Sequence, residues 1–519
     1  MFRPDRSARG FSASLRRRLY LVFDKAGSKA VYWLALTLLV TLPCSGAPGA
    51  EPSVAPGRMV PIGSVDERFQ SYNIEMVEVT GGRFWKPYSS ERFDPHPDQF
   101  EFRHPIDLDN PRLRKLASAL APAYLRVSGS WANATYFADA DGSSAVPPGF
   151  GGVLSRQRWR GVVDFAEAVG AEIVTSFAVS PGTRDAAGIW SPDQARRLLS
   201  YTRSIGGRVA AAEFMNEPNV ALGAAAPASD DAASYARDSR IFRAFVKENF
   251  PSLLLLGPGT AGETNSASDL LSASGPDAVD VVSYHYYGAL SERCGGTDAP
   301  EDPLSEARLN GTDHTAAFYR SLRDRFAPGK PIWLTETAEA ACGGNRWDAT
   351  FLDTFRYLDQ LGRLARIGVQ VVMQNTLAAS DYGMVDEKTL QPRADYWGAL
   401  LWRRLMARVV LDPGVPIEPR LHVYAHCQRG IRGGVSLLII NLDRAPRSLS
   451  LPITSERYTL QAASAPNEPL LLNGTPLHLS ADDDLPPLAG AQTAAGALTF
   501  APFTISFLAI PEAANQACQ

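Results

Sequence analysis

Apolar runs alternate with amphipathic stretches from residue 71 to residue 410 of the chain. Eight of these runs have the length and composition of buried strands, namely Tyr72–Val79, Ala123–Val127, Glu172–Val179, Ala210–Met215, Leu253–Gly257, Val279–Tyr284, Pro331–Thr335 and Val369–Met373. Helical spacing of apolar positions is clearest between them in Trp159–Val169 and Tyr235–Asn249. The alternation predicts an α/β fold with an eight-stranded β/α (TIM) barrel over residues 71–410. A doubly wound open sheet is the alternative that the pattern leaves open.

One predicted helix, Pro192–Ser204, carries a start signal. Ser191 is expected to be its N-cap, Pro192 takes the first helical position, and Gln194 completes a capping box. The signal predicts that the helix begins at Pro192.

The pattern changes near residue 411, where short alternating runs are separated by Gly, Pro and Asn turns. These runs are Leu421–Ala425, Val435–Asn441, Ser448–Ile453, Tyr458–Gln461 and Leu498–Ile510. They predict a smaller C-terminal all-β sandwich domain over residues 411–519. The segment 51–70 precedes the first barrel strand and is expected to add an edge strand to that domain.

The first fifty residues have the pattern of an export signal. Arg16, Arg17 and Arg18 form a basic stretch, Ala30–Leu42 is an unbroken apolar run, and small residues follow as far as Ala50. The run is shorter than the about 20 apolar residues that a membrane-spanning helix needs. Residues 1–50 are therefore expected to be a signal peptide, or an N-terminal anchor if they are kept, on a periplasmic or extracellular protein.

Composition narrows the class of protein further. The chain of 519 residues is 45% hydrophobic and 20% charged, which excludes wholesale disorder and fibrous repeats. A formal net charge of −4 gives no general attraction to nucleic acid or to an acidic membrane surface. We therefore expect no nucleic-acid partner, and a membrane contact only through a retained N-terminal segment.

Two short segments carry the candidate chemistry. Asn216-Glu217 follows the predicted fourth strand, and Glu336 ends the seventh, so both acids belong to the face where barrel enzymes place their active sites. Cleavage of a glycosidic bond needs one carboxyl group that stays protonated and one that is ionised. An amide such as that of Asn216 suits the sugar 2-hydroxyl. The pair predicts a glycosidase in which Glu217 is the general acid/base and Glu336 the nucleophile.

A glycine-rich run, Gly257–Gly262, fits the GxGxxG pattern of dinucleotide sites. That pattern belongs in the first unit of a doubly wound fold, whereas here it follows the fifth predicted strand, and Pro258 removes one amide from the turn. We interpret the run as a barrel loop. No cofactor is expected, and no cysteine or histidine spacing predicts a metal site.

The chain resembles the heparanase family of retaining β-glucuronidases, glycoside hydrolase family 79, over most of its length. The similar segments are Leu113–Ala117, Ala121–Arg126, Asn216–Asn219, His285–Tyr287, Trp333–Thr337, Gly343–Gly344, Tyr382–Glu387, Asp395–Trp397, Val423–Cys427, Asn473–Gly474 and Ala517–Cys518. The resemblance implies hydrolysis of β-linked glucuronic acid with retention of configuration.

The same resemblance implies roles for further residues. Backbone amides of Gly343 and Gly344, with Tyr382, would bind the substrate carboxylate, since paired N–H groups in a turn form an anion-binding concavity. The residues that would bind the rest of the sugar or lie beside the nucleophile are Glu75, Ser130, Asn216, His285, Tyr287, Gln374 and Asn375.

Two departures from the animal members of the family affect the expected substrate. The stretch from Ala138 to Arg160 is short where those enzymes carry an excised linker, so we expect one uncleaved chain. The segment Gly259–Ser274 has no Lys or Arg, which argues against heparan sulfate. The expected partner is a carbohydrate containing glucuronic acid, cut in exo or endo fashion. The alternatives are a barrel glycosidase for neutral β-glycans and a non-catalytic carbohydrate-binding protein.

The five cysteines agree with export. Cys44 lies in the N-terminal segment, and the even number that remains predicts two disulfides in an oxidising compartment. Cys427 follows the first strand of the predicted β domain and Cys518 is penultimate, so this pair would tie the tail to the domain. Cys294 and Cys342 fall in neighbouring barrel loops, after strands six and seven, and form the second expected pair.

Overall fold

A computed structural model describes residues 52–88, 99–141, 145–220, 231–296, 303–463 and 469–519. The predicted signal peptide or anchor of residues 1–50, with Cys44, lies outside the described residues. In the part of the chain that is described, no helix has both the length and the apolar character needed to cross a membrane.

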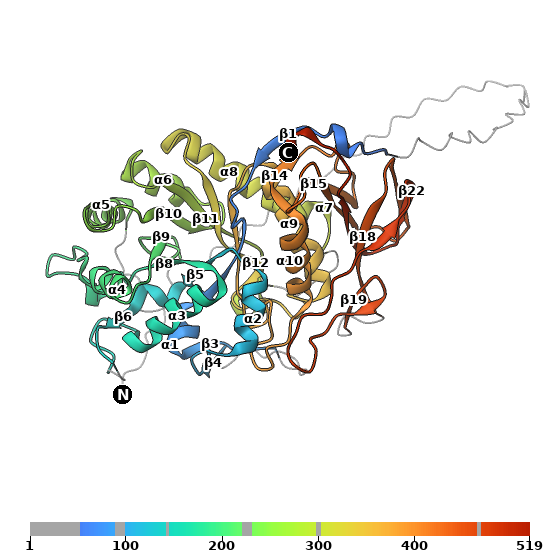
Figure 1. Cartoon of the computed structure of the whole chain (residues 1–519). Coiled ribbons are helices and arrows are strands. Elements are labelled where there is room, and N and C mark those ends of the chain that lie inside the picture. The colour runs from blue at the N-terminus through green and yellow to red at the C-terminus, as the bar shows by residue number, and fades with distance from the viewer. Residues whose placement is uncertain (1–51, 89–98, 142–144, 221–230, 297–302, 464–468) are drawn as a thin grey trace, which may run out of the picture. The chain divides into compact units, whose positions relative to one another are not determined.

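Eight parallel strands close into a barrel (Figure 1). They are β2 (Gln70–Glu75), β5 (Ala123–Ser128), β8 (Ala171–Ser176), β9 (Val209–Glu213), β10 (Leu254–Ala261), β11 (Val281–Leu290), β12 (Ile332–Ala341) and β13 (Val371–Gln374). Closure occurs where β13 pairs with β2, Val372 opposite Gln70. The predicted barrel is confirmed and the open sheet is wrong. Apolar side chains such as Val174, Leu256 and Trp333 fill the barrel interior, as expected for a packed barrel core.

Helices surround these strands. They are α1 (Met76–Thr80), α2 (Pro111–Ala119), α3 (Arg156–Val169), α4 (Asp193–Ser204), α5 (Ala232–Asn249), α6 (Asn265–Ser274), α7 (Glu306–Leu309), α8 (Gly311–Phe326), α9 (Phe351–Arg366) and α10 (Ala394–Leu405). Most have one buried stripe, but α9 is buried on nearly every side. It is enclosed because it packs on the barrel and also against the C-terminal sheet, where Leu358 and Leu438 share one apolar core.

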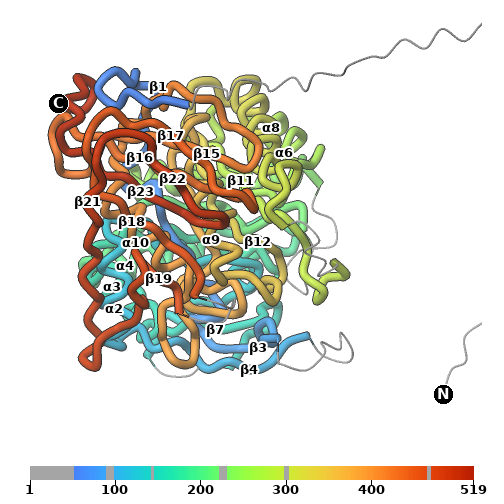
Figure 2. Tube along the Cα trace, turned by 90° about the vertical axis from the view of Figure 1, so that its right-hand side faces the viewer, coloured from blue at the N-terminus to red at the C-terminus, as the bar shows by residue number. Residues whose placement is uncertain are grey.

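The C-terminal domain is built on a nine-stranded antiparallel sheet. Its strands are β1 (Pro61–Ser64), β14 (Met406–Leu411), β15 (Leu421–Gln428), β16 (Val435–Asn441), β18 (Ser455–Ala462), β19 (Leu470–Leu472), β20 (Thr475–Pro476), β21 (Ala491–Thr493) and β23 (Thr504–Ile510). β1 lies at the edge and pairs with β14. A second, smaller layer consists of β17 (Arg447–Leu451) and β22 (Gly496–Phe500), seen near β16 and β23 in Figure 2. Leu449 and Phe500 of that layer pack on one face of the sheet.

Several boundaries differ from the sequence prediction. Glu336 does not end the seventh barrel strand, because β12 continues past it to Ala341 and pairs with β11 as far as that residue. The β domain begins with β14 at Met406 instead of residue 411, because α10 runs directly into that strand. The first barrel strand ends at Glu75, where a capping box with Glu78 starts α1. The run Leu498–Ile510 is two strands, separated by a turn in which Phe503 has a φ of 48°.

Two local predictions were wrong. Helix α4 begins at Asp193, and the Ser191 hydroxyl accepts a hydrogen bond from the Asp193 N–H at 3.4 Å. The predicted capping box does not form, because the amide oxygen of Gln194 instead accepts a hydrogen bond from the Phe137 N–H at 2.8 Å. Gly257–Gly262 is not a loop, since β10 continues through it to Ala261 and pairs with β11 there. A glycine-rich run inside a central strand leaves no phosphate-binding turn.

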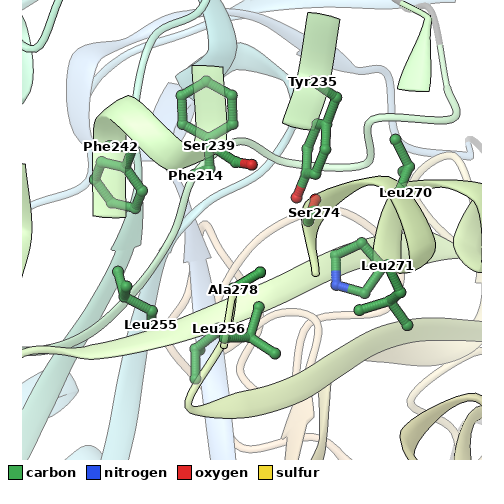
Figure 3. A pocket seen from close by; sticks show the side chains of 12 residues that line it. Phe214, Tyr235, Ser239, Phe242, Leu255, Leu256, Leu270, Leu271, Ser274 and Ala278 are labelled. Atoms are coloured by element: carbon green, nitrogen blue, oxygen red, sulfur yellow. The ribbon is translucent and has the colours of Figure 1, made fainter. Parts of the chain in front are cut away.

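A cavity of about 20 Å³ lies between α5, α6 and β10 (Figure 3). Phe214, Tyr235 and Phe242 line one side of it, and Leu255 and Leu271 the other. The space suffices for about one water molecule. It is a packing gap behind the barrel wall rather than a ligand site.

Candidate active site

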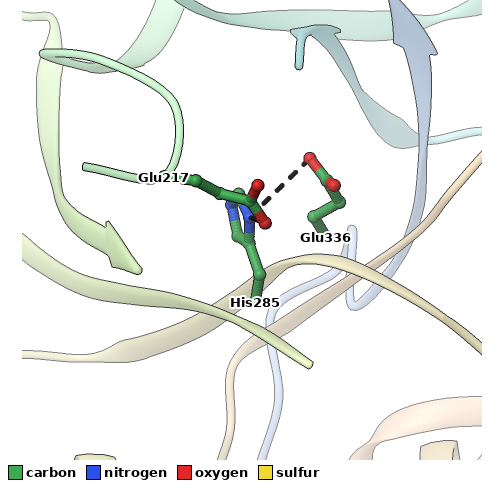
Figure 4. A group of neighbouring side chains, drawn as sticks. All are labelled: Glu217, His285 and Glu336. Atoms are coloured by element: carbon green, nitrogen blue, oxygen red, sulfur yellow. Dashed lines mark hydrogen bonds and ion pairs between the residues drawn. The ribbon is translucent and has the colours of Figure 1, made fainter. Parts of the chain in front are cut away.

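Glu217 and Glu336 approach each other at one end of the barrel, with His285 beside both (Figure 4). Glu217 follows β9, and Glu336 lies in β12 opposite His285 of β11. Nδ1 of His285 is 2.9 Å from Oε1 of Glu217 and 3.7 Å from Oε2 of Glu336. One oxygen of each carboxylate and one ring nitrogen all lie within 4.8 Å of one another. The structure thus brings together the two acids that the sequence analysis selected.

The loop that presents Glu217 is strained and firmly held. Glu217 has a φ of 43°, in the left-handed region that residues with a side chain seldom adopt. The side-chain amide of Asn133 bonds both the N–H and the carbonyl of Asn216, each at 2.8 Å. Asn219 bonds the backbone of Ala261 in the same two-sided way. These four hydrogen bonds keep Glu217 in place against the strain.

A buried arginine, Arg126 of β5, connects the site's acidic groups. Its guanidinium donates to Glu213 and to Glu336, each at 2.8 Å, and to the Asn216 side chain at 2.7 Å. Glu213 also accepts hydrogen bonds from Ser283 and Thr335. Fully buried charges are stable only when they are paired in this way. The network fixes the side chains around Glu336 without solvent.

The two acids have opposite pKa shifts. Burial raises the pKa of Glu217, and the nearby charge of Glu336 raises it further. Burial acts in the same direction on Glu336, but the charges of His285 and Arg126 outweigh it and lower the pKa. Burial would lower the pKa of His285, yet the charge of Glu336 and bonds to Glu213 and Glu217 raise it to about 9. As pH rises, therefore, Glu336 is the first of the two acids to ionise and Glu217 the one that keeps its proton longer.

Glu217, His285 and Glu336 are also the one group of three possible metal ligands among the described residues. The contacts do not suit a metal ion. The Nδ1 of His285 is already hydrogen-bonded to Glu217 at 2.9 Å. Glu336 already accepts from Arg126 and from Tyr287. The chemistry of these groups is that of a proton-transfer site.

A second hydrogen-bonded chain extends from Glu336 across the barrel mouth. The Tyr287 hydroxyl donates to Glu336 Oε1 at 2.6 Å, and Asn375 donates to the Tyr287 hydroxyl at 3.0 Å and to Glu75 at 3.1 Å. Burial, with the charge of Glu336, raises the pKa of Glu75 well above its usual range. A Cβ at Gly129 would lie 1.5 Å from a Glu75 carboxylate oxygen, so glycine is required there. Glu75, Tyr287 and Asn375, which the sequence analysis assigned to the site, therefore form one polar wall.

The Gly343-Gly344 turn follows β12 and touches Tyr382. Both glycines have positive φ angles, of 84° and 88°, and a Cβ at Gly344 would lie 2.9 Å from the Tyr382 N. The carbonyl of Gly343 accepts from Ser380 Oγ at 2.9 Å and that of Gly344 from Arg293 at 2.7 Å. These bonds engage both carbonyls of the turn.

Both predicted disulfides are confirmed. Cys294 and Cys342 are bonded with their Cα atoms 6.3 Å apart, and Cys342 immediately precedes the Gly343-Gly344 turn. Cys427 and Cys518 are bonded at a Cα separation of 5.4 Å, which ties the end of the chain to β15. The first of these bonds anchors the candidate anion-binding turn to the loop after β11.

Two predicted site residues lie apart from these networks. Gln374 ends β13 and is buried, and neither its amide oxygen nor its amide nitrogen has a partner among the described residues. Ser130 begins the short 3-10 helix η2 (Ser130–Ala134), directly after Gly129. Gln374 is therefore a buried polar group beside the site, and Ser130 lies at its rim.

Comparisons with known proteins identify the family. The model for glycosyl hydrolase family 79, N-terminal domain, matches residues 104–362. Heparanase-like protein 1 of Arabidopsis thaliana is 30% identical over 386 residues, covering 69% of each chain. The chain belongs to glycoside hydrolase family 79. Heparanase of Mus musculus is 28% identical, covering 79% of this chain and 88% of its own.

A solved structure agrees with the fold of this family 79 chain. A 4-O-α-L-rhamnosyl-β-D-glucuronidase from Fusarium oxysporum 12S has a TM-score of 0.63 at 14% identity, covering 89% of this chain and 99% of its own. At that identity the likeness supports the fold alone. Family membership and the barrel together make the protein a glycoside hydrolase.

Sequence reasoning missed three functional residues of this hydrolase: Arg126, Glu213 and Asn133. Arg126 and Glu213 each interrupt an apolar strand run, and a charged residue inside a buried strand was a usable signal. No such signal marked Asn133, whose partner Asn216 lies 83 residues along the chain.

Proposed function

We propose that this family 79 protein is a retaining β-glucuronidase in which Glu217 is the general acid/base and Glu336 the nucleophile. The observation that carries the proposal is the pair of opposite pKa shifts on two carboxylates whose oxygens lie within 4.8 Å. Retaining glycosidases have carboxyl groups about 5–5.5 Å apart, whereas inverting enzymes separate them by about 6.5–9.5 Å to admit a water.

The reaction has two displacements. In the first, a carboxylate oxygen of Glu336 bonds to the anomeric carbon, and Glu217 gives its proton to the glycosidic oxygen, which leaves as an alcohol. In the second, the Glu217 carboxylate removes a proton from water, whose oxygen displaces Glu336 from that carbon. Arg126 and Tyr287, each bonded to Glu336, orient the nucleophile. The first product is the β-anomer.

Glucuronic acid is the proposed sugar. The backbone turn of Gly343 and Gly344, beside Tyr382, would offer an anion-binding concavity for its carboxylate. Glu75 and Asn375 are placed to bind ring hydroxyls on the same side. Membership of family 79, with its heparanase and heparanase-like relatives, supports this choice.

The mechanism is tested with two variants. Glu336→Ala should lose nearly all activity and recover part of it with azide, which replaces the missing nucleophile. Glu217→Ala should still turn over substrates with activated leaving groups, because these need no proton from the enzyme. NMR of the first product decides the stereochemistry, and α-glucuronic acid would reject the double displacement.

The substrate is tested with aryl β-glucuronide, β-glucoside and β-xyloside. Glucuronide should be strongly preferred, while preference for a neutral glycoside would support the alternative of a neutral β-glycanase. Tyr382→Phe should weaken glucuronide hydrolysis by about 1–3 kcal/mol, the cost of leaving a buried polar group unpaired. Equal losses on glucuronide and glucoside would remove the case for carboxylate recognition at Tyr382.

The proposed place of action is outside the cytoplasm. The charged and apolar pattern of residues 1–50 supports export, and two disulfides persist most readily in an oxidising compartment. Fractionation of the expressing cell, with mass spectrometry of the mature N-terminus, tests this. A chain starting near residue 50 indicates cleavage, a full-length chain in the membrane fraction indicates an anchor, and recovery in the cytoplasm would refute export.

A further inference from the structure

A buried arginine, Arg293, lies beneath the Gly343-Gly344 turn and holds its backbone. It belongs to the short 3-10 helix η5 (Glu292–Cys294) in the loop after β11, and its side chain is buried. Its Nη1 donates to the carbonyl of Cys342 at 3.1 Å and to that of Gly344 at 2.7 Å. The disulfide between the last residue of η5 and Cys342 joins the same two segments covalently. The turn is thus fixed to η5 by three links.

The other two nitrogens of Arg293 are also engaged. Nε and Nη2 donate to the carbonyl of Lys86, which follows β3 (Gly82–Trp85), at 2.9 Å and 2.7 Å. Nη2 also donates to the carboxylate of Asp381, and the guanidinium lies over the ring of Tyr88, 3.9 Å from its centroid. A planar guanidinium with a partner at every nitrogen has a fixed position and orientation. Arg293 is therefore a rigid support for the turn.

This support also sets the direction of the N–H groups of the turn. The peptide bonds from residue 342 to residue 345 are trans, and in a planar trans peptide the carbonyl and the following N–H point in opposite directions. The carbonyls of Cys342 and Gly344 both point at Arg293. The N–H groups of the next residues, Gly343 and Asn345, therefore both point away from the arginine.

Arg293 also brings a positive charge close to the proposed carboxylate site. Burial raises the pKa of the Tyr382 hydroxyl well above its usual range, and the charge of Arg293 acts in the opposite direction. A cation bonded to the carbonyl end of a peptide polarises it and makes its N–H end a better donor to an anion. The Asp381 carboxylate balances the charge of Arg293. The field at the turn therefore depends on both members of this ion pair.

We propose that Arg293 is a positioning residue that determines the preference for glucuronides over neutral glycosides. It holds the turn with N–H groups directed at the sugar carboxylate, and its charge strengthens them as donors. The guanidinium itself does not contact the substrate. This inference rests on the proposed glucuronidase activity and on the proposed role of the Gly343-Gly344 turn.

The first test is Arg293→Lys, assayed on 2,4-dinitrophenyl β-glucuronide and β-glucoside, whose good leaving group keeps slow glucoside hydrolysis measurable. Lysine keeps the charge, but one ammonium group cannot bond all the partners of the guanidinium. The ratio of kcat/KM for glucuronide to that for glucoside should fall by about tenfold. The loss should appear as a higher KM for glucuronide with kcat unchanged, because contacts to the carboxylate are made equally in the ground and transition states.

A matched control is available in the loop after β8. Arg184 is likewise buried, donates to the carbonyls of Val179 and Gly188 at 3.1 Å and 2.9 Å, and pairs with Asp238 at 2.6 Å. Arg184→Lys removes the same kind of contacts from a segment that does not include the turn. It should leave the ratio of the two substrates unchanged, even where both activities fall.

The second test, Asp381→Asn, changes the charge in the favourable direction. Asparagine keeps an oxygen that can accept from Arg293 and from the Tyr88 N–H, which bonds Asp381 at 3.3 Å, but the guanidinium loses its counter-charge. The KM for glucuronide should fall by about threefold while that for glucoside stays the same. A purely structural role of the ion pair predicts weaker binding of both substrates. This variant decides the question if Arg293→Lys does not fold.

The outcomes separate this inference from the proposed function. Equal losses on both substrates in Arg293→Lys, or a glucuronide KM that does not fall in Asp381→Asn, would refute the role of Arg293 and leave the glucuronidase standing. A wild-type enzyme that does not hydrolyse the glucuronide would refute the proposed function itself.

Discussion

Replacement of Arg126 by methionine should destabilise the protein as much as truncation of a large buried apolar side chain does. The arginine side chain is 1% exposed and pairs with two carboxylates, Glu213 and Glu336. Arg126→Met leaves both acids buried without a counter-charge, and such a loss destabilises proteins by about 3–5 kcal/mol. The free energy of unfolding, measured in urea with the disulfides intact, should fall by that amount.

A double variant distinguishes this cause from simple loss of packing. Glu213→Gln removes one of the two uncompensated charges, so the pair Arg126→Met/Glu213→Gln should be more stable than the sum of the single losses predicts. Arg126→Lys should be intermediate, because one ammonium group cannot reach both carboxylates. A single loss below about 1 kcal/mol, or strict additivity in the double variant, would refute the reasoning.

The same substitution has a catalytic consequence. The charge of Arg126 lowers the pKa of Glu336, so its removal should raise that pKa and leave more of the carboxyl protonated in acid. The acidic limb of the profile of kcat/KM against pH should therefore move to higher pH. An unchanged limb would show that Arg126 does not control the ionisation of Glu336.

Further predictions concern the acids, a disulfide and a buried histidine. Wild-type kcat/KM should follow a bell-shaped pH profile, rising as Glu336 ionises and falling as Glu217 loses its proton; a profile without the alkaline fall would contradict these roles. The double variant Cys427→Ser/Cys518→Ser opens a loop with a sequence separation of 91 and should lower the free energy of unfolding in urea by about 4–5 kcal/mol; a loss under about 1 kcal/mol would contradict this. His422 is held between two carboxylates on α7 and α9, and its pKa is raised to about 9. The stabilisation that charged His422 gives the folded state is complete below its unfolded pKa of about 6.5 and is lost as pH rises through about 9. Between these two pH values, the free energy of unfolding should therefore fall less in His422→Gln than in the wild type.

The barrel was predictable because its strands are buried and therefore appear in the sequence as apolar runs. Each of the eight apolar runs proposed as strands overlaps one barrel strand. Errors arose where a distant partner decides the local structure. Gln194 has the right spacing for a capping box, but the N–H of Phe137 takes its side-chain oxygen. The turn within the apolar run Leu498–Ile510 could not be seen in the sequence. The φ of 48° at Phe503 depends on packing and is not marked by the residue type.

Prediction of the site succeeded for the two carboxylates and failed for the residues that support them. Glu217 and Glu336 stand beside recognisable neighbours in the sequence, and the barrel topology implies that they meet. The partners of Arg126 lie 87 and 210 residues away, so its contacts become visible only in three dimensions.

The pairing of β1 with β14 makes the barrel an insertion within the β domain. Edge strand β1 precedes the whole barrel and its partner follows it, and Asn515 near the chain's end bonds the carbonyls of Pro56 and Met59. A single proteolytic nick between α10 and β14 would therefore release neither part, because β1 still joins the barrel to the sheet. Separation would need a second cut, between β1 and β2. Cleavage of the chain at the sequence boundary between the barrel and the β domain would thus not separate the two domains.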